Sequence, residues 1–445
     1  MSAAALPDCS SDAIAKSSPL PAGDFAVRLM ATRALTLDLC ASLEPEDMTP
    51  QSMADASPAK WHLAHTSWFF ETFALLPFLP GYCVFHARYA ELFNSYYVSA
   101  GPRYARPQRG LVTRPTVAEV RRYRAHVDLH LRKLLDMHAG LDAAERAADA
   151  RSDAGPTSHL PRVLELGLQH EQQHQELLLT DVLHLLAHNP LKPAWRLLPA
   201  PPSQTARPLR FVCGEQGAHA IGHAGMGFRF DNEAPRHPTW LAPHALADRL
   251  VSNAEYRDFI RDGGYDEPLL WLSDGWSAVQ REGWRAPLYW SADAASSFTL
   301  AGEQALDPNA PVCHISHFEA DAFARWAGAR LPTEAEWEAF ASTQPLRGNG
   351  LDAGYCRPAA PSPGHTQVYG DAWEWTGSSY LPYPGYKVAE GPLGEYNGKF
   401  MSGQMVLRGG SCVTPPGHLR ATYRNFFYPH QRWQFMGLRL AKDQT

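Results

Sequence analysis

The chain has 445 residues, too many for one hydrophobic core, so its length indicates two or three domains. A hydrophobic content of 45% and an aromatic content of 11%, with 13 Trp, exclude a disordered or fibrous chain. The formal net charge of −6 leaves no broad basic field, so nucleic acid is not an expected partner. No apolar run reaches the roughly 18 residues that span a bilayer, so no membrane partner is expected.

Residues 1–24 are rich in Ala, Ser and Pro and lack the basic start and apolar core of a secretory signal. We expect a disordered leader there. The seven cysteines are odd in number, scattered along the chain and never spaced as CxxC. This usage argues against a disulfide framework or a zinc knuckle and predicts a reducing, cytoplasmic setting.

Four amphipathic stretches in residues 25–190 predict long helices. Ser57-Pro58 places a capping residue before a proline at the first helical position, and Thr116 with Glu119 is close to a capping box. The predicted helices cover residues 26–43, 58–76, 116–138 and 161–188. Four helices joined by loops predict a four-helix bundle.

The loop between the second and third helices, residues 79–115, is rich in aromatic and Arg residues, and so long a loop without regular structure is usually functional. Residues 191–209 are rich in proline and predict a linker. In residues 210–445, Gly, Trp, Pro and short β-like runs replace the helical periodicity, with helical stretches only at 252–262 and 317–328. This half is expected to be an α+β domain.

Two histidines lie four residues apart in His170-Glu171-Gln172-Gln173-His174, inside the fourth predicted helix. Residues four apart project from one helix face, so the two imidazoles can clamp a metal ion. The alternative is a pair of ordinary surface histidines. Glu171 follows the first histidine directly, as in HExxH zinc proteases, so a protease with Glu171 as general base stays open.

A third ligand is expected from a neighbouring helix. The run Trp61-His62-Leu63-Ala64-His65 offers two histidines, three residues apart on nearly one face, and spacing alone does not choose between them. Three histidines without a carboxylate leave coordination positions open and suit iron, zinc or copper.

These residues carry a resemblance. Residues 57–71, SPAKWHLAHTSWFFE, together with HEQQH at 170–174, resemble the DinB-like domain of ergothioneine-biosynthesis (EgtB-type) sulfoxide synthases, a family with related selenoneine synthases. The second half resembles the domain shared with sulfatase-modifying, formylglycine-generating enzymes, which has a C-type-lectin-like α+β fold. Its motifs are NAEY at 253–256, RLPTEAEWE at 330–338, GDAWEWT at 370–376, RGGS at 408–411 and GLR at 437–439.

The resemblance implies a non-haem Fe(II) held by His65, His170 and His174. His62 is then a supporting or core residue, and Glu171 is expected on the helix surface or hydrogen-bonded behind the ligands. The family's reaction joins a thiol to the imidazole C2 of hercynine (N-trimethyl-histidine), with O₂ as co-substrate, and gives a sulfoxide. Three neutral imidazoles leave positions for the sulfur, the substrate imidazole and O₂.

Asn94-Ser95-Tyr96-Tyr97 lies in the long aromatic loop. In one branch of the family a tandem tyrosine at this place supplies a phenol near the oxygen, and Tyr96 and Tyr97 match it. The resemblance therefore implies that at least one of them donates a proton and favours sulfoxidation over oxidation of the thiol. The alternative is that both tyrosines only pack a domain interface.

Three further residues match positions that contact hercynine in the family. Gln173, just before the second histidine of the clamp, matches a substrate contact. Asn425 and Phe426 match the C-terminal loop that closes the pocket, where Asn425 would bind the carboxylate. Phe426 would face the trimethylammonium group, a cation–π contact of about 1–2 kcal/mol when desolvated.

The prediction of the second substrate rests on a position where the chain differs from the family pattern. Relatives that use γ-glutamylcysteine carry an Asp directly before a Tyr-Pro and an Arg shortly after it; here the first position is Phe427, and the second falls near 430–432. Because an apolar ring cannot pair with the glutamyl ammonium, free cysteine becomes the expected thiol. Arg88, Arg103 and Arg106 are candidates for its carboxylate, unless they only face solvent.

Three alternatives stay open. A selenoneine synthase would join a selenosugar to hercynine with the same metal clamp and pocket. A zinc-loaded thiol transferase would work without O₂, and a non-catalytic binding module would bind no metal. A formylglycine-generating activity is not expected, because it needs a close pair of C-terminal cysteines and Cys412 has no cysteine after it.

Overall fold

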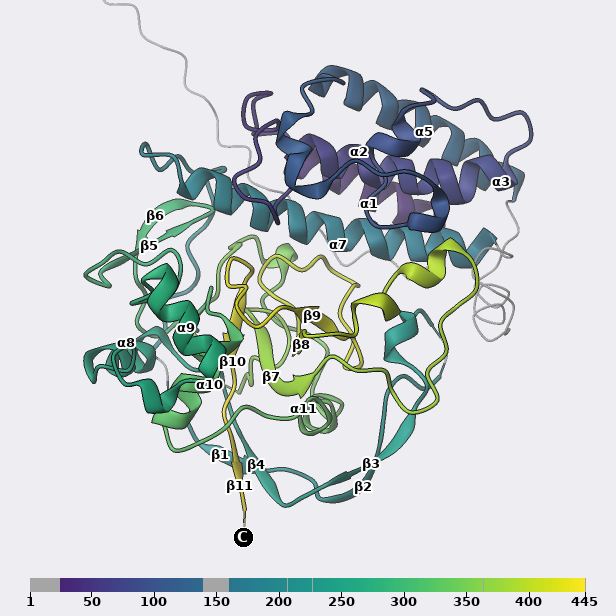
Figure 1. The fold of residues 1–445 in the computed structure, drawn as a ribbon. Helices are drawn as coiled ribbons and strands as arrows, with labels where there is room; N and C mark the ends of the chain where they lie inside the picture. Colours follow the sequence, from purple (N-terminus) through teal and green to yellow (C-terminus); the bar gives the residue numbers. More distant parts are fainter. Residues whose placement is uncertain (1–24, 139–159, 206, 226, 363, 445) are drawn as a thin grey trace, which may run out of the picture.

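A helical half and a mixed α/β half lie one against the other in the computed structural model (Figure 1). The structure describes residues 25–138, 160–205, 207–225, 227–362 and 364–444. The leader predicted at 1–24 lies outside these residues. The expectation of a helical bundle followed by an α+β domain is confirmed.

The first half is built from four long helices, α1 (Phe25–Leu39), α2 (Ala59–Phe70), α5 (Val117–Met137) and α7 (Leu160–Ala187). The amphipathic pattern explains why they assemble: on α5, Val120, Val127 and Leu134 recur every seven residues and are fully buried. Thr116 caps α5, because its side chain accepts a hydrogen bond from the Glu119 amide. Beyond α2, the chain continues as a π-helical turn, η1 (Glu71–Leu75), and α3 (Leu76–Phe78).

The long loop of the first half is not structureless, contrary to the sequence prediction. It contains three short helical turns, α4 (Tyr89–Leu92), η2 (Val98–Ala100) and η3 (Arg106–Leu111). The Tyr89 hydroxyl donates to Glu119 at the start of α5 (2.8 Å), which ties the loop to the bundle.

The second half contains two sheets and two hairpins. The strands are β1 (Phe211–Cys213), β2 (Gly217–Ile221), β3 (His237–Leu241), β4 (His244–Ala247), β5 (Ser296–Thr299), β6 (Gly302–Ala305), β7 (Trp373–Ser379), β8 (Met405–Arg408), β9 (Asn425–Phe427), β10 (Met436–Leu438) and β11 (Ala441–Asp443). Their order is β1-β4-β11 in one sheet and β10-β7-β8-β9 in the other, with hairpins β2-β3 and β5-β6. Within the described part of the chain, β10 and β7 pair in parallel and all other paired strands are antiparallel.

The helices of the second half are α8 (Asn253–Arg261), α9 (Ser273–Glu282), α10 (His317–Trp326) and α11 (Glu334–Ala341). The predicted helices at 252–262 and 317–328 are confirmed as α8 and α10, whereas the omission of α9 and α11 was wrong. A capping box of Thr333 and Glu336 marks the start of α11, a signal that its shortness obscured. In α9, a Cβ at Gly275 would lie 2.9 Å from Phe318, so close packing against α10 explains a glycine inside a helix.

Helix α7 lies on the side of the bundle that faces the second half (Figure 1). Glu176 on α7 is buried and accepts hydrogen bonds from the Trp373 indole (2.7 Å), the Thr414 hydroxyl (2.8 Å) and the Ser411 hydroxyl (2.5 Å). Behind α7, Trp195 of the proline-rich segment bonds to the Leu39 carbonyl (3.1 Å). These contacts fix the histidine-bearing helix against the second half.

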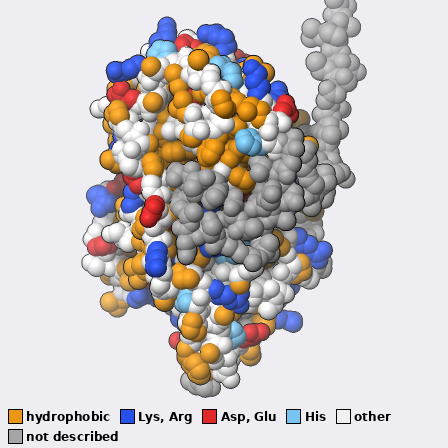
Figure 2. Space-filling view, turned by 90° about the vertical axis from the view of Figure 1, so that its right-hand side faces the viewer, with side chains coloured by type: hydrophobic (Ala, Val, Ile, Leu, Met, Phe, Trp, Pro, Cys, Tyr) orange, Lys and Arg blue, Asp and Glu red, His pale blue; other side chains and the backbone are white. Residues whose placement is uncertain are grey.

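On the face shown in Figure 2, Lys and Arg side chains are scattered and do not merge into one basic field. This distribution agrees with the net charge of −6. Among the described residues, no helix is both long and apolar enough to cross a bilayer.

Candidate metal centre and substrate pocket

Three histidines meet where α2 packs on α7. His65 comes from α2, and His170 and His174 come from one face of α7, one turn apart. One ring nitrogen from each lies within 4.8 Å of the other two, and all three side chains are buried. Among the residues that the structure describes, this is the single group of three or more His, Cys, Asp or Glu with such spacing.

The ring nitrogens are arranged as a metal would require. His65 Nδ1 lies 2.6 Å from the Phe93 carbonyl, which only accepts, so Nδ1 donates and Nε2 carries a lone pair. That Nε2 lies 3.2 Å from His170 Nε2. Burial lowers the pKa of His170 to about 3 and those of His65 and His174 well below the usual value. Neutral imidazoles are the form that binds metal, so the residues fit a metal ion.

Glu171 follows the first α7 ligand but points away from the metal-binding nitrogens. It is fully buried, with one carboxylate oxygen bonded to Arg33 (2.9 Å) and the other to Thr36 (2.6 Å) and Arg124. The two guanidinium groups outweigh burial and lower the pKa of Glu171 to about 2. Of the two positions expected for Glu171, the helix surface was wrong and the hydrogen-bonded position behind the ligands is confirmed. A carboxylate with both oxygens engaged cannot serve as a protease general base.

Replacing Glu171 should destabilise the fold. In Glu171→Gln, Arg124 loses its buried counter-ion and Arg33 keeps only Asp128 (2.6 Å), so we expect a loss of about 3–5 kcal/mol in the free energy of unfolding. Because the folded-state pKa lies below the unfolded value of 4.5, the stabilisation is present above pH 4.5 and lost as the pH falls toward 2.

Urea unfolding followed between pH 2 and 7 measures both effects. The acid-dependent loss should be smaller in Glu171→Gln than in the wild type. Glu165→Gln is the matched control on the same helix, because it removes a part-exposed pair with Arg28 and should cost no more than about 1 kcal/mol. Equal losses in the two variants would contradict the role given to Glu171.

The tandem tyrosines lie against the bundle core. Tyr97 is fully buried and packs on Trp68 (5.6 Å between ring centroids), while Tyr96 stacks on Tyr97 at 4.5 Å. The two hydroxyls lie 3.4 Å apart, and burial raises the pKa of both phenols. Glu395 of the second half holds the loop by accepting from the amides of Val98 (3.1 Å) and Ser99 (2.8 Å).

Gln173 points toward the second half, between two tyrosines that the sequence prediction missed. Its amide nitrogen donates to the Tyr423 hydroxyl (2.8 Å), and its amide oxygen accepts from the Tyr396 hydroxyl. The Tyr396 ring lies 5.7 Å from the His170 ring and 5.5 Å from Phe230. Gln173 therefore joins the metal-site helix to a group of aromatic rings, Tyr396, Tyr423 and Phe230, which we call the aromatic wall.

Strand β9 supplies more of this wall. Phe426 stacks on Tyr380 at 4.0 Å and lies 5.9 Å from Phe400, whose ring is 5.2 Å from Tyr96. Asn425 and Phe427 are half-buried on the same strand. The structure thus brings the tyrosine loop and β9 together across Phe400.

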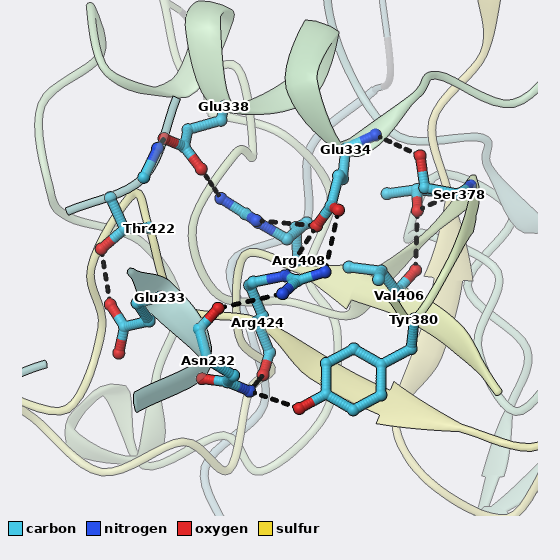
Figure 3. A network of polar contacts seen from close by, with 12 residues as sticks. Asn232, Glu233, Glu334, Glu338, Ser378, Tyr380, Val406, Arg408, Thr422 and Arg424 are labelled. Atoms are coloured by element: carbon cyan, nitrogen blue, oxygen red, sulfur yellow. Dashed lines mark hydrogen bonds and ion pairs between the residues drawn. The ribbon is translucent and has the colours of Figure 1, made fainter. Parts of the chain in front are cut away.

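A buried polar network holds β9 in place (Figure 3). Arg424, directly before the strand, donates to both carboxylate oxygens of Glu334 (2.9 Å each), and Arg408 of β8 shares that carboxylate. Asn232 donates to the Tyr380 hydroxyl (2.9 Å), which orients the ring that stacks on Phe426.

The predicted arginines are not gathered at the histidines. The Arg88 side chain is 78% exposed and pairs with Glu91, and Arg103 is exposed. Arg106 donates to the Asp55 carbonyl. Arg109, which the sequence prediction passed over, is buried instead.

Arg109 lies behind one of the histidines. Its guanidinium lies 3.4 Å from the Trp61 ring centroid, and Trp61 stacks on His65 at 4.5 Å. It also donates to the hydroxyls of Ser57 (2.9 Å) and Ser95 (3.3 Å), the residue before Tyr96. The cation thereby links the start of α2 to the tyrosine loop.

The two halves match two known families. Residues 28–178 match the DinB superfamily, and residues 202–355 and 359–444 match the sulfatase-modifying factor enzyme 1-like domain. The chain is 34% identical over 308 residues to a hercynine oxygenase of Mycobacterium tuberculosis, covering 63% of this chain and 71% of that protein. It is 28% identical to a formylglycine-generating enzyme of Streptomyces coelicolor, covering 55% and 93%. It is 27% identical to ergothioneine biosynthesis protein 1 of Schizosaccharomyces pombe, covering 48% and 28%.

Proposed function

Because the chain belongs to the EgtB-type hercynine oxygenase family and is an oxygenase-type enzyme, we propose that it joins hercynine to a sulfur donor with Fe(II) and O₂. The observation that carries the proposal is the buried three-histidine group, which faces an aromatic wall from the second half across Gln173 and Tyr396. This arrangement offers three ligands for a metal and, next to them, aromatic faces for a cationic substrate.

The proposed reaction balances with O₂ as the sole oxidant. The imidazole C2–H and the S–H bonds break, and one C–S bond forms. One oxygen atom becomes the sulfoxide oxygen, and the other leaves as water with the two hydrogens. The substrates lose four electrons, and O₂ gains four.

His65, His170 and His174 would hold the iron, the first two through Nε2 atoms that lie 3.2 Å apart. When bound, iron would supply open positions for O₂ and sulfur and the one-electron chemistry that O₂ requires. Because burial raises the pKa of Tyr96 and Tyr97, both remain phenols at neutral pH and hold a proton ready at Oη. The closed wall of Tyr396 and its neighbours would exclude water.

Hercynine carries a trimethylammonium group, which an aromatic face binds without a hydrogen bond. We propose that the rings of Phe426 and Phe400 meet this group and that Asn425 binds the carboxylate. Gln173 is already engaged by Tyr396 and Tyr423, so its role is to orient these phenols around the substrate imidazole.

We propose free cysteine as the sulfur donor, in a cytoplasmic setting. Phe427 cannot pair with a glutamyl ammonium. Arg432, the arginine that falls near the second of these positions, is buried in an ion pair with Glu319 (3.1 Å) and donates to the Ala286 carbonyl. The same features admit a selenosugar, so a selenoneine synthase is the second candidate.

Anaerobically purified protein loaded with Fe(II) tests the proposal. We expect O₂-dependent consumption of hercynine with cysteine and a product heavier by one cysteine and one oxygen, less two hydrogens. γ-Glutamylcysteine should react at least about tenfold less efficiently, as loss of one charge pair predicts. Turnover with a selenosugar alone would overturn the choice of sulfur, and turnover without O₂ would overturn the oxygenase chemistry.

A further inference from the structure

One histidine of the metal group is backed by a second histidine from the opposite helix. His62 and His65 lie three residues apart on α2, and Asp181 lies two turns after His174 on α7. His62 Nδ1 lies 2.9 Å from His174 Nδ1, and His62 Nε2 lies 3.0 Å from Asp181 Oδ2. The same Oδ2 accepts the Ser57 amide (2.8 Å).

The Asp181 carboxylate, at the end of this chain, sets the direction of the hydrogen bonds. A carboxylate only accepts, so His62 Nε2 donates to Asp181. A neutral His62 then has its lone pair on Nδ1, and His174 Nδ1 must donate to it. That leaves the lone pair of His174 on Nε2, the nitrogen that can turn toward His65 and His170.

We propose that Asp181 and His62 are positioning residues that fix the tautomer and ring plane of His174, so that Nε2 is its metal-binding atom. His62 is thus neither a fourth ligand nor a core filler. The cluster is uneven: the Phe93 carbonyl orients His65, the His62–Asp181 chain orients His174, and His170 Nδ1 is buried without a hydrogen-bond partner among the described residues.

Burial makes this chain effective. His62 is 2% exposed and His174 is 8% exposed, so water cannot replace a missing partner without reorganising the site. A carboxylate–histidine support of this kind fixes a ligand and raises its basicity, and its loss typically costs ~10–100-fold in metal affinity. The inference rests on the proposed metal centre but on none of its substrates.

The test compares metal binding in His62→Phe, which keeps a ring but removes both nitrogens, with binding in the wild type. We expect the Kd for Fe(II) to rise about 10–100-fold and the visible spectrum of the Co(II)-loaded protein to shift, with one metal still bound at saturation. Thr180→Val is the matched control on α7, because it removes a buried hydrogen bond to the Leu177 carbonyl and should leave the Kd unchanged.

A second pair of variants separates positioning from folding. Since one oxygen of Asp181 accepts both bonds, Asp181→Asn can keep the geometry and should stay near the wild-type Kd and spectrum, whereas Asp181→Leu should match His62→Phe. This pair decides the question if His62→Phe does not fold.

Two results would overturn the inference. A wild-type Kd and Co(II) spectrum in both His62→Phe and Asp181→Leu would show that the chain does not position His174. Complete loss of metal in His62→Phe would make His62 a ligand. Failure of the metal centre itself is distinguishable, because His170→Ala would then still bind metal.

Discussion

His170→Ala is expected to lose stoichiometric iron binding and, with it, measurable turnover of hercynine. In the proposed site the residue would supply one of three ligand nitrogens, and the two remaining histidines, on separate helices, leave too few donors to retain Fe(II) against water. The activity should therefore fall well beyond the ~10–100-fold that loss of a supporting residue costs. Iron content after desalting and the initial rate with saturating hercynine and cysteine measure the two effects.

His184→Ala is the matched control for this experiment. It removes another buried histidine of α7, one whose Nδ1 bonds to the Ser52 hydroxyl (2.7 Å) far along the helix from the cluster. The control should keep iron and activity even if it loses some stability. A His170→Ala protein that holds one tight equivalent of iron would show that the metal binds elsewhere.

Much of the helical half could be predicted because its signals are local. A repeat of apolar residues and a capping threonine are enough to define α5, and HxxxH on α7 is enough to place two imidazoles on one face. Helix α9 was missed because it contains Gly275, a residue that weakens helices and whose place only the neighbouring Phe318 explains. Helix α11 was missed because it has only 8 residues.

The site was predictable only where its residues share an element. The spacing of His62 and His65 placed both on one face of α2 without separating their roles, because the difference lies in Asp181 and Phe93, which belong to other segments. Tyr396 was missed for the same reason: it meets Gln173 from 223 residues away, and no periodicity encodes such a contact.

The role of Glu171 could not be predicted from its own segment. HExxH spacing alone permits a protease, and the structure excludes it because arginines from α1 and α5 bind the carboxylate. A buried charge takes its role from its partners rather than from its neighbours in sequence. The HxxxH spacing therefore predicted the pair of histidines, whereas the role of Glu171 between them depends on contacts with other helices of the bundle.

Tyr97→Phe is expected to divert the reaction from the sulfoxide to simple oxidation of cysteine. The Tyr97 ring lies 6.5 Å from Phe69, whose ring lies 4.6 Å from His170, so we expect Tyr97, the tyrosine on the histidine side, to be the donor. Loss of a positioned general acid costs about 10²–10⁴-fold, and we expect sulfoxide formation to fall in that range with hercynine affinity unchanged. Because burial raises the pKa of Tyr97, the wild-type rate should show no tyrosine deprotonation below pH ~10.

Tyr96→Phe is the matched comparison, since it keeps the stacked ring at 4.5 Å and removes only the supporting hydroxyl. Its sulfoxide yield should fall less than that of Tyr97→Phe, and the ratio of sulfoxide to oxidised cysteine, measured by mass spectrometry, separates the two. A larger diversion in Tyr96→Phe would assign the proton to Tyr96. Wild-type product ratios in both would mean that the tandem tyrosines only pack the loop against Trp68 and its neighbours.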